Sequence, residues 1–253
     1  MTDHIQIAKS DGLLTLVIDR PAKKNALTDA MYKALADALE SARDDAEVRV
    51  VLLRGQGDMF TSGNYVGEFA TIAMGGQQPQ HVTRFLHAIA TATKPIVAAV
   101  QGRAVGVGTT MLLHCDHVVL ADDALLVTPF VNLALVPEAA SSLLLPARIG
   151  YVRAFAMFAL GEPVTAQDAV AWGLANKAVP ASELVATAEA FARRLAAQPV
   201  GALIATKQLM RDSAALLAQI DRENQHFFER LKTAEAREAF MAFAERRAPR
   251  FAP

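Results

Sequence analysis

The stretch from Lys94 to Ala121 constrains the fold of this chain more than any other, because its pattern predicts strand, glycine-rich turn, helix and strand in succession. Its first part, Ile96–Val100, is a run of β-branched residues and alanine that is long enough for a buried strand and too short for a helix. Gly106 and Gly108 flank the turn, and residues 109–114 are predicted to be helical. Unpaired backbone N–H groups at the start of such a helix can hold an anion beyond the strand end. A tight strand-to-helix crossover, in which glycine serves only packing, explains the same pattern.

Composition restricts the partners of the chain. Its 253 residues are 53% hydrophobic and 20% charged, which is enough apolar material for one large buried core. The net charge is −1 with no block of like charge, so neither a nucleic acid nor a membrane surface is an expected partner. The single cysteine, Cys115, excludes an internal disulfide, and no apolar run is long enough to cross a membrane. The N-terminus has no signal-peptide pattern, so we expect a cytoplasmic protein that binds a small molecule or another copy of itself.

The chain before this stretch predicts a hairpin, a helix and a third strand. Apolar residues on both sides of Asp11-Gly12 favour a β-hairpin. Thr28 is a suitable cap for a helix that extends to about Arg43 with apolar residues at helical spacing. The run Val48–Leu53 is typical of a strand that is buried on both faces.

A second glycine-containing turn follows that strand directly. Residues 54–65 lead out of the strand end through Gly55, Gly57 and Gly63. Two turns of this kind at two strand ends could each direct one N–H group at a single oxygen atom. That arrangement is an oxyanion hole, which stabilises negative charge as it develops in a transition state.

Four segments together carry a resemblance to a known family. They are RP at 20–21 with NAL at 25–27, FTSGN at 60–64, VQGRAVGVG at 100–108, and RAPRF at 247–251. In this order, they resemble the crotonase (enoyl-CoA hydratase/isomerase) superfamily over nearly the whole chain. The resemblance implies an α/β fold, a spiral of ββα units with a C-terminal helical trimerisation region, and assembly into homotrimers or dimers of trimers. Gln198-Pro199 marks the expected boundary between a core domain, 1–198, and a C-terminal helical region, 199–253.

The resemblance also implies a substrate and a site. The substrate is an acyl-CoA thioester, so coenzyme A enters as part of the substrate and no separate cofactor is expected. By position, the backbone N–H groups of Ser62 and Gly106 would hold the thioester oxygen. The residues that would line the coenzyme A arm are Lys24, Ala26, Ser62, Asn64 and Tyr65. Tyr65 departs from the aspartate that is usual at its position.

The reaction depends on which acids and bases surround the thioester. Hydratases of this family carry two glutamates, and this chain has Thr110 and Phe130 at the corresponding positions. Neither side chain can take a proton from water, so hydration loses its usual acid and base. Thr110 and Phe130 remain expected substrate-binding residues.

Glu138 is the expected catalytic base. It follows Pro137 within TPFVNLALVPEAASS, which resembles the Δ3,Δ2-enoyl-CoA isomerase branch. Such an isomerase needs one carboxylate to remove a proton from C2 and return it at C4. A simpler interpretation places Glu138 in the first turn of a helix over 139–149, where it stabilises the helix dipole. Two other functions stay open: a hydratase or another crotonase reaction with an unrecognised base, and an acyl-CoA-binding module without turnover.

The consecutive polar residues His114, Cys115, Asp116 and His117 are not expected to form a metal site. They lie at a predicted helix-to-strand junction, where adjacent side chains diverge. No metal is therefore expected, and a structural role is favoured for this segment.

Overall fold

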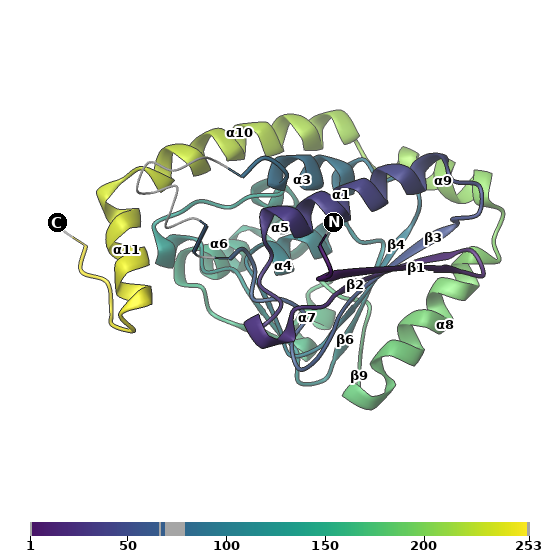
Figure 1. Ribbon diagram of the computed structural model, residues 1–253, viewed down its shortest axis with the longest axis horizontal. Helices are drawn as coiled ribbons and strands as arrows, with labels where there is room; N and C mark the ends of the chain where they lie inside the picture. Colours follow the sequence, from purple (N-terminus) through teal and green to yellow (C-terminus); the bar gives the residue numbers. More distant parts are fainter. Residues whose placement is uncertain (1, 66, 69–78, 252–253) are drawn as a thin grey trace.

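The buried strands predicted from the sequence lie in one large sheet. The computed structural model describes residues 2–65, 67–68 and 79–251 (Figure 1). Its six-stranded sheet has the order β1-β2-β3-β4-β6-β9, and every neighbouring pair is parallel except the β1–β2 hairpin. The strands are β1 (Ile5–Ser10), β2 (Leu13–Ile18), β3 (Val50–Gly55), β4 (Ile96–Val100), β6 (His117–Ala121) and β9 (Lys177–Val179).

A smaller sheet lies beyond the carboxyl ends of these strands. It has the order β5-β7-β8, with bounds β5 (Arg103–Val105), β7 (Leu125–Val127) and β8 (Val164–Thr165). The chain leaves β4 for β5 and later leaves β6 for β7, so successive strands alternate between the two sheets. Two isolated parallel bridges, Leu27–Asn64 and Thr61–Ala104, add earlier segments to the same layer. The result is a spiral in which each turn contains one strand of the large sheet, one extended segment of the small layer and, in most turns, a helix.

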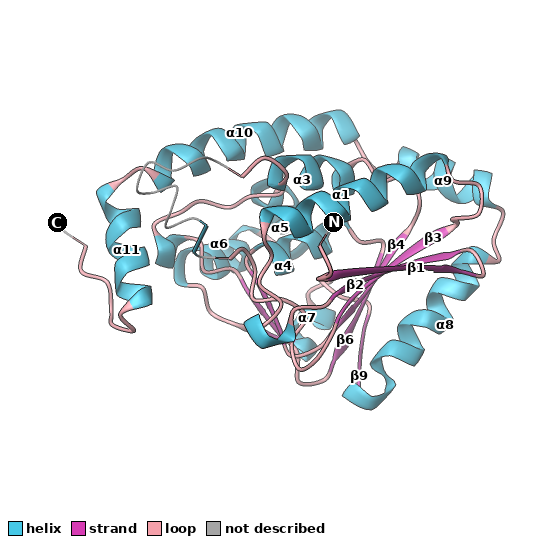
Figure 2. Ribbon diagram, in the orientation of Figure 1, coloured by secondary structure: helices cyan, strands magenta, loops and turns pink. Residues whose placement is uncertain are grey.

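Helices cover both faces of the large sheet (Figures 1 and 2). Helix α8 packs on β3, β4 and β6, while α1, α3 and α10 are stacked on the opposite side. The helices are α1 (Asp29–Asp44), α3 (Val82–Ala90), α4 (Val107–Thr110), α5 (Ser141–Ile149), α6 (Tyr151–Leu160), α7 (Ala166–Ala171), α8 (Leu184–Ala196), α9 (Val200–Leu209), α10 (Ser213–Leu231) and α11 (Ala234–Ala244), with short 3-10 turns at Pro21–Lys23, Met111–His114, Val131–Leu133 and Ala181–Glu183. None of the helices in the described ranges has the length and apolar character needed to cross a bilayer.

Most of the predicted elements are confirmed, and their physical signals are visible. The β1–β2 turn has positive φ at both Asp11 and Gly12, the backbone of a tight hairpin. Helix α1 begins after Thr28, whose side chain accepts a hydrogen bond from the Met31 N–H group. The strand predicted at 48–53 is found two residues later, and the strand Ile96–Val100 has the predicted bounds.

The second half differs from the sequence pattern in detail. Residues 200–231 form two helices, α9 and α10, and Asp212 caps the second helix by accepting a hydrogen bond of 3.0 Å from the Ala215 N–H group. The helix expected over 139–149 begins only at Ser141. The division into domains 1–198 and 199–253 stays a prediction.

Candidate active site

The two glycine-containing turns lie side by side, as the sequence predicts. Thr61 donates its N–H to the Arg103 carbonyl at 3.2 Å, and Val105 donates to the Thr61 carbonyl at 3.1 Å. Gly63 has φ +85°, and a Cβ atom on it would lie 2.6 Å from the Val105 carbonyl oxygen. Only glycine allows this close approach of the two segments.

The two N–H groups predicted to form the oxyanion hole are already engaged, so that prediction is wrong. Ser62 donates its N–H to the Lys24 carbonyl at 2.9 Å, and Gly106 donates to the Val127 carbonyl at 2.8 Å. Both bonds tie the small sheet layer together. Which N–H groups are bonded could not be predicted from the sequence, because the direction of an N–H group depends on backbone angles that the motif does not specify.

Asn64 and Val107 have N–H groups for which the described residues supply no acceptor. Each lies three residues beyond one member of the Thr61–Ala104 bridge, so the two residues occupy equivalent places on adjacent segments. Gly106 turns the chain between β5 and α4 with φ +56° and ψ −119°, a conformation that favours glycine. This turn leaves the Val107 N–H at the free start of α4.

Glu138 is a buried carboxyl group, only 3% exposed, and its Oε1 atom has no hydrogen-bond partner among the described residues. Burial raises its pKa to about 8, and the nearby Glu223 carboxylate contributes in the same direction. The Asn64 side-chain amide favours the charged form and partly opposes this rise in pKa. A carboxyl group with a pKa near neutral pH can both accept and return a proton.

Asn64 connects this carboxyl group to a second buried polar residue. The Tyr32 hydroxyl, from α1, donates a hydrogen bond to the Asn64 Oδ1 atom. Because Oδ1 is occupied as an acceptor, the amide nitrogen of Asn64 is the group that faces Glu138. Burial and the neighbouring Glu138 raise the Tyr32 pKa well above its ordinary value, so its hydroxyl remains a donor. Asn64 therefore places a backbone N–H that has no acceptor in the described ranges close to Glu138, the acid/base candidate.

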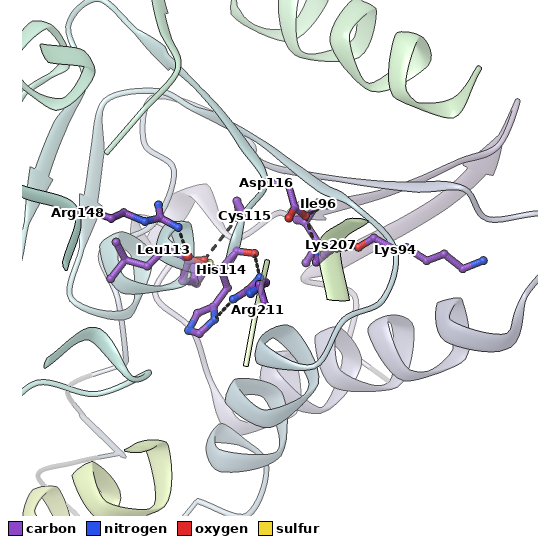
Figure 3. Close-up of polar contacts among 10 residues, drawn as sticks. Lys94, Ile96, Leu113, His114, Cys115, Asp116, Arg148, Lys207 and Arg211 are labelled. Carbon is purple, nitrogen blue, oxygen red and sulfur yellow. Dashed lines mark hydrogen bonds and ion pairs between the residues drawn. The ribbon is translucent and has the colours of Figure 1, made fainter. Parts of the chain in front are cut away.

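The turn that follows Glu138 is unusual, and it corrects the simpler interpretation of this residue. Ala139 and Ala140 have φ values of 63° and 54°, so Glu138 precedes a left-handed turn instead of lying in the first turn of a helix. His114 donates from Nε2 to the Ala139 carbonyl at 2.7 Å. Its Nδ1 faces the Arg211 guanidinium at 2.9 Å, as Figure 3 shows. Burial lowers the His114 pKa to about 3, so the ring is neutral and carries its proton on Nε2.

The neighbours of His114 point to separate partners (Figure 3). The Cys115 thiol faces the Met111 carbonyl, and Asp116 accepts from the Ile96 N–H group and from Lys207 at 2.6 Å. His117 stacks on Phe191 with 3.4 Å between ring centroids. In the described ranges, no group of acidic, histidine or cysteine side chains is arranged to bind a metal ion.

The residues expected along the coenzyme A arm lie around the Leu27–Asn64 bridge. The Lys24 ammonium pairs with Asp58 at 2.8 Å on the surface, and Ala26 is buried. Tyr65 is 38% exposed, with the Arg20 guanidinium 5.0 Å from its ring centroid. The Lys24 carbonyl holds Ser62 in place, and the role of these residues in binding coenzyme A stays a prediction.

The two positions that would carry glutamates in a hydratase are both buried and uncharged. Thr110 is 1% exposed, and its hydroxyl faces the Val107 carbonyl at 3.5 Å. Phe130 is 5% exposed and packs against Phe158, with 6.0 Å between ring centroids. Sequence reasoning identified these two positions and Glu138. It missed Tyr32, Glu223 and the role of His114, which contact the site from distant parts of the chain.

The chain is similar over nearly its whole length to proteins of known family. Residues 8–253 match the family model described as "Enoyl-CoA hydratase/isomerase". The 1,2-epoxyphenylacetyl-CoA isomerase of Escherichia coli (strain K12) is 33% identical over 262 residues, with 99% of each chain covered. Enoyl-CoA delta isomerase 2 of Rattus norvegicus is 30% identical over 250 residues, covering 96% of this chain and 64% of that protein.

A solved structure described as an enoyl-CoA hydratase/isomerase from Pseudoalteromonas atlantica T6c has a TM-score of 0.93 and 40% identity, covering 99% of this chain and 100% of that chain. Relatives named as hydratases match at similar identity to those named as isomerases. The spiral of ββα units predicted from the resemblance is therefore confirmed. This chain belongs to the enoyl-CoA hydratase/isomerase family and has the crotonase fold.

Proposed function

We propose that the protein is a Δ3,Δ2-enoyl-CoA isomerase in which Glu138 is the single acid/base group. The observation that carries this proposal is the arrangement around Asn64. Its side chain faces a buried carboxyl group with a pKa of about 8, and its backbone N–H has no acceptor among the described residues. The uncharged residues Thr110 and Phe130 leave Glu138 without a second carboxylate at the positions that hydration would use.

The reaction divides into two proton transfers. The thioester oxygen of a 3-enoyl-CoA lies between the N–H groups of Asn64 and Val107, which replace the pair expected from the sequence. Glu138, in its charged form, removes a proton from C2, and the electron pair delocalises over the thioester and the double bond as a dienolate. The two N–H groups stabilise the charge on the oxygen. The protonated Glu138 then returns the proton at C4, which leaves the double bond between C2 and C3 and regenerates the base.

The raised pKa suits a base that must also act as an acid. An ordinary glutamate would be fully charged at neutral pH but would accept a carbon-bound proton poorly. With a pKa of about 8, Glu138 is a stronger base when charged, and its protonated form is still populated. Because the charged form starts the reaction, kcat/KM should rise with pH through this pKa.

The test compares wild type with Glu138→Gln on 3-enoyl-CoA and 2-enoyl-CoA substrates. Glutamine keeps the shape of the side chain but cannot accept the proton. We expect kcat for double-bond migration to fall by at least about 10²-fold, while acyl-CoA affinity is nearly unchanged. Glu229→Gln, an exposed position on α10, is the matched control and should have wild-type rates.

Three outcomes would reject the proposal. Full isomerase activity in Glu138→Gln would remove this residue from the mechanism. Water addition much faster than isomerisation in wild type would identify a hydratase. Tight acyl-CoA binding with neither reaction would identify a binding module.

Assembly and location belong to the same proposal. Helix α6 exposes Tyr151, Val152 and Phe155, which are 70%, 81% and 58% accessible, and an apolar face of this kind favours contact with another subunit. We propose homotrimers or dimers of trimers in the cytoplasm. Sedimentation equilibrium measures the assembly, and a monomer at micromolar concentration would contradict it.

A further inference from the structure

We propose that Glu223 is a positioning residue for Glu138, because its carboxylate fixes the left-handed turn on which Glu138 is presented. This inference rests on the proposed function, in which Glu138 transfers the proton. Glu223 lies on α10, far from Glu138 in the sequence, and it is only 5% exposed. Nothing in the proposed reaction uses it directly.

Glu223 binds the turn through three donors. The Ala140 N–H donates to its Oε2 at 2.6 Å, and the Ser142 N–H donates to its Oε1 at 2.9 Å. The Ser142 hydroxyl donates to the same Oε1 atom. Ala140 is the N-cap residue of α5 and has no side-chain oxygen to accept these N–H groups. Glu223 therefore supplies, from another helix, the cap that α5 lacks.

One peptide group in the turn is held from both sides. The peptide that joins Ala139 to Ala140 has its carbonyl bound by His114 and its N–H bound by Glu223. Both alanines have positive φ, a conformation that persists only when the surrounding structure imposes it. This peptide lies one residue beyond Glu138, so holding it in place restricts the backbone from which the Glu138 side chain projects.

The charge of Glu223 acts on Glu138 as well. With three donors on its two oxygens, Glu223 is the better stabilised anion, whereas the Glu138 Oε1 atom has no partner among the described residues. Glu223 therefore ionises at lower pH, although burial raises its own pKa above the ordinary value. Its negative charge then disfavours ionisation of Glu138. This effect on the Glu138 pKa is second only to that of burial.

The groups around Glu223 do not neutralise its negative charge. A cavity of about 370 Å³ beside Glu223 is lined by Gln219, Arg222 and His226, among others. Arg222 donates to the Gln219 Oε1 atom at 2.7 Å, and His226 faces Glu229 at 3.6 Å. No cation in the described ranges forms an ion pair with Glu223. On the other side, Glu138 faces Tyr32 and Asn64, which are both neutral.

The test uses two substitutions with different effects. Glu223→Gln removes the charge, and its amide nitrogen cannot accept a hydrogen bond, so at least one of the three bonds is lost. We expect the acid limb of the kcat/KM profile to move to lower pH and kcat to fall by about tenfold or more, because misplacing a catalytic group slows the reaction. Glu223→Asp keeps the charge but shortens the reach. It should therefore lower kcat with less movement of the pH profile, and it replaces the glutamine variant should that one fail to fold.

Carbon-13 NMR of protein labelled at the glutamate carboxyl carbons measures the titration midpoint of Glu138 without turnover. The Glu138 signal is the one that is missing in Glu138→Gln. Its midpoint should lie lower in Glu223→Gln than in wild type, and Glu229→Gln should match wild type. A purely structural Glu223 would lower the melting temperature and leave the Glu138 midpoint and kcat unchanged, which would overturn the proposal. If the midpoint moves but the enzyme does not isomerise enoyl-CoA, the proposed function fails while the electrostatic coupling of Glu223 to Glu138 stands.

Discussion

Replacing Asn64 by alanine should impair catalysis through the Glu138 pKa while leaving the fold intact. The substitution removes the side-chain amide that lowers this pKa and keeps the backbone N–H that we assign to the oxyanion hole. Without the amide, the pKa of Glu138 should rise further above about 8, because burial and the Glu223 charge are then less opposed. The charged, active form of Glu138 becomes scarcer at neutral pH.

The Asn64 amide affects this pKa less than burial or the Glu223 charge does. We therefore take the lower value for a hydrogen bond, about 0.5–1.5 kcal/mol, which corresponds to a loss of about 2- to 12-fold in kcat/KM at pH 7. Activity should recover towards wild type as pH rises, since the variant still has the base. The Tyr32 hydroxyl loses its acceptor in the buried interior, which lowers the free energy of unfolding by about 1–3 kcal/mol.

The assay is isomerase kcat/KM between pH 6 and pH 10 for wild type, Asn64→Ala and Tyr32→Phe. Tyr32→Phe keeps the amide opposite Glu138 and is the matched control, so its acid limb should move less. An Asn64→Ala profile with the wild-type midpoint would refute the assignment of Asn64 as the partner of Glu138. A uniform loss of activity at every pH would point to the backbone of this turn instead.

Three further predictions follow from the same contacts. Glu138→Gln should be more stable than wild type at pH 9 by about 3–5 kcal/mol, because a group whose pKa rises from 4.5 to about 8 on folding loses its stabilising effect as pH rises through that range. Urea unfolding at pH 5 and pH 9 measures this, and the same difference in free energy of unfolding between variant and wild type at both pH values would contradict it. Ser62→Ala should leave kcat within about twofold of wild type, because the backbone N–H of residue 62 remains bound to the Lys24 carbonyl, whereas Gly106→Pro should abolish activity because proline cannot adopt φ +56°. Wild-type turnover in Gly106→Pro would show that this turn is not needed. Asp212→Ala should lower the free energy of unfolding by about 0.5–2 kcal/mol through loss of the α10 cap, measured by thermal melting, and an unchanged melting temperature would argue against the cap.

The sequence predicted those parts of the site that depend on local pattern. The strand Ile96–Val100, the Thr28 cap and the two glycine turns each have a signal within a few residues, and all were found. Glu138 was singled out by a motif, and burial raises its pKa, while its catalytic role stays a proposal.

The parts that could not be predicted depend on long-range contacts and backbone direction. The choice between Ser62 and Asn64 as donor depends on which N–H group faces Lys24, and that follows only from the pairing of three segments. The left-handed turn at Ala139 contains no glycine that would predict it from the sequence. His114 and Glu223, from distant elements, hold this turn through hydrogen bonds. Local propensity favours a helix that already includes the two alanines, and tertiary contacts override this preference.

A 3-enoyl-CoA deuterated at C2 shows whether one carboxylate moves one proton. If Glu138 removes and returns the same proton within an enclosed site, a measurable fraction of the 2-enoyl-CoA product should carry deuterium at C4, and Glu138→Gln should form almost no product. No deuterium at C4 in any product, or a 3-hydroxyacyl-CoA as the main product, would rule out proton transfer by Glu138 alone.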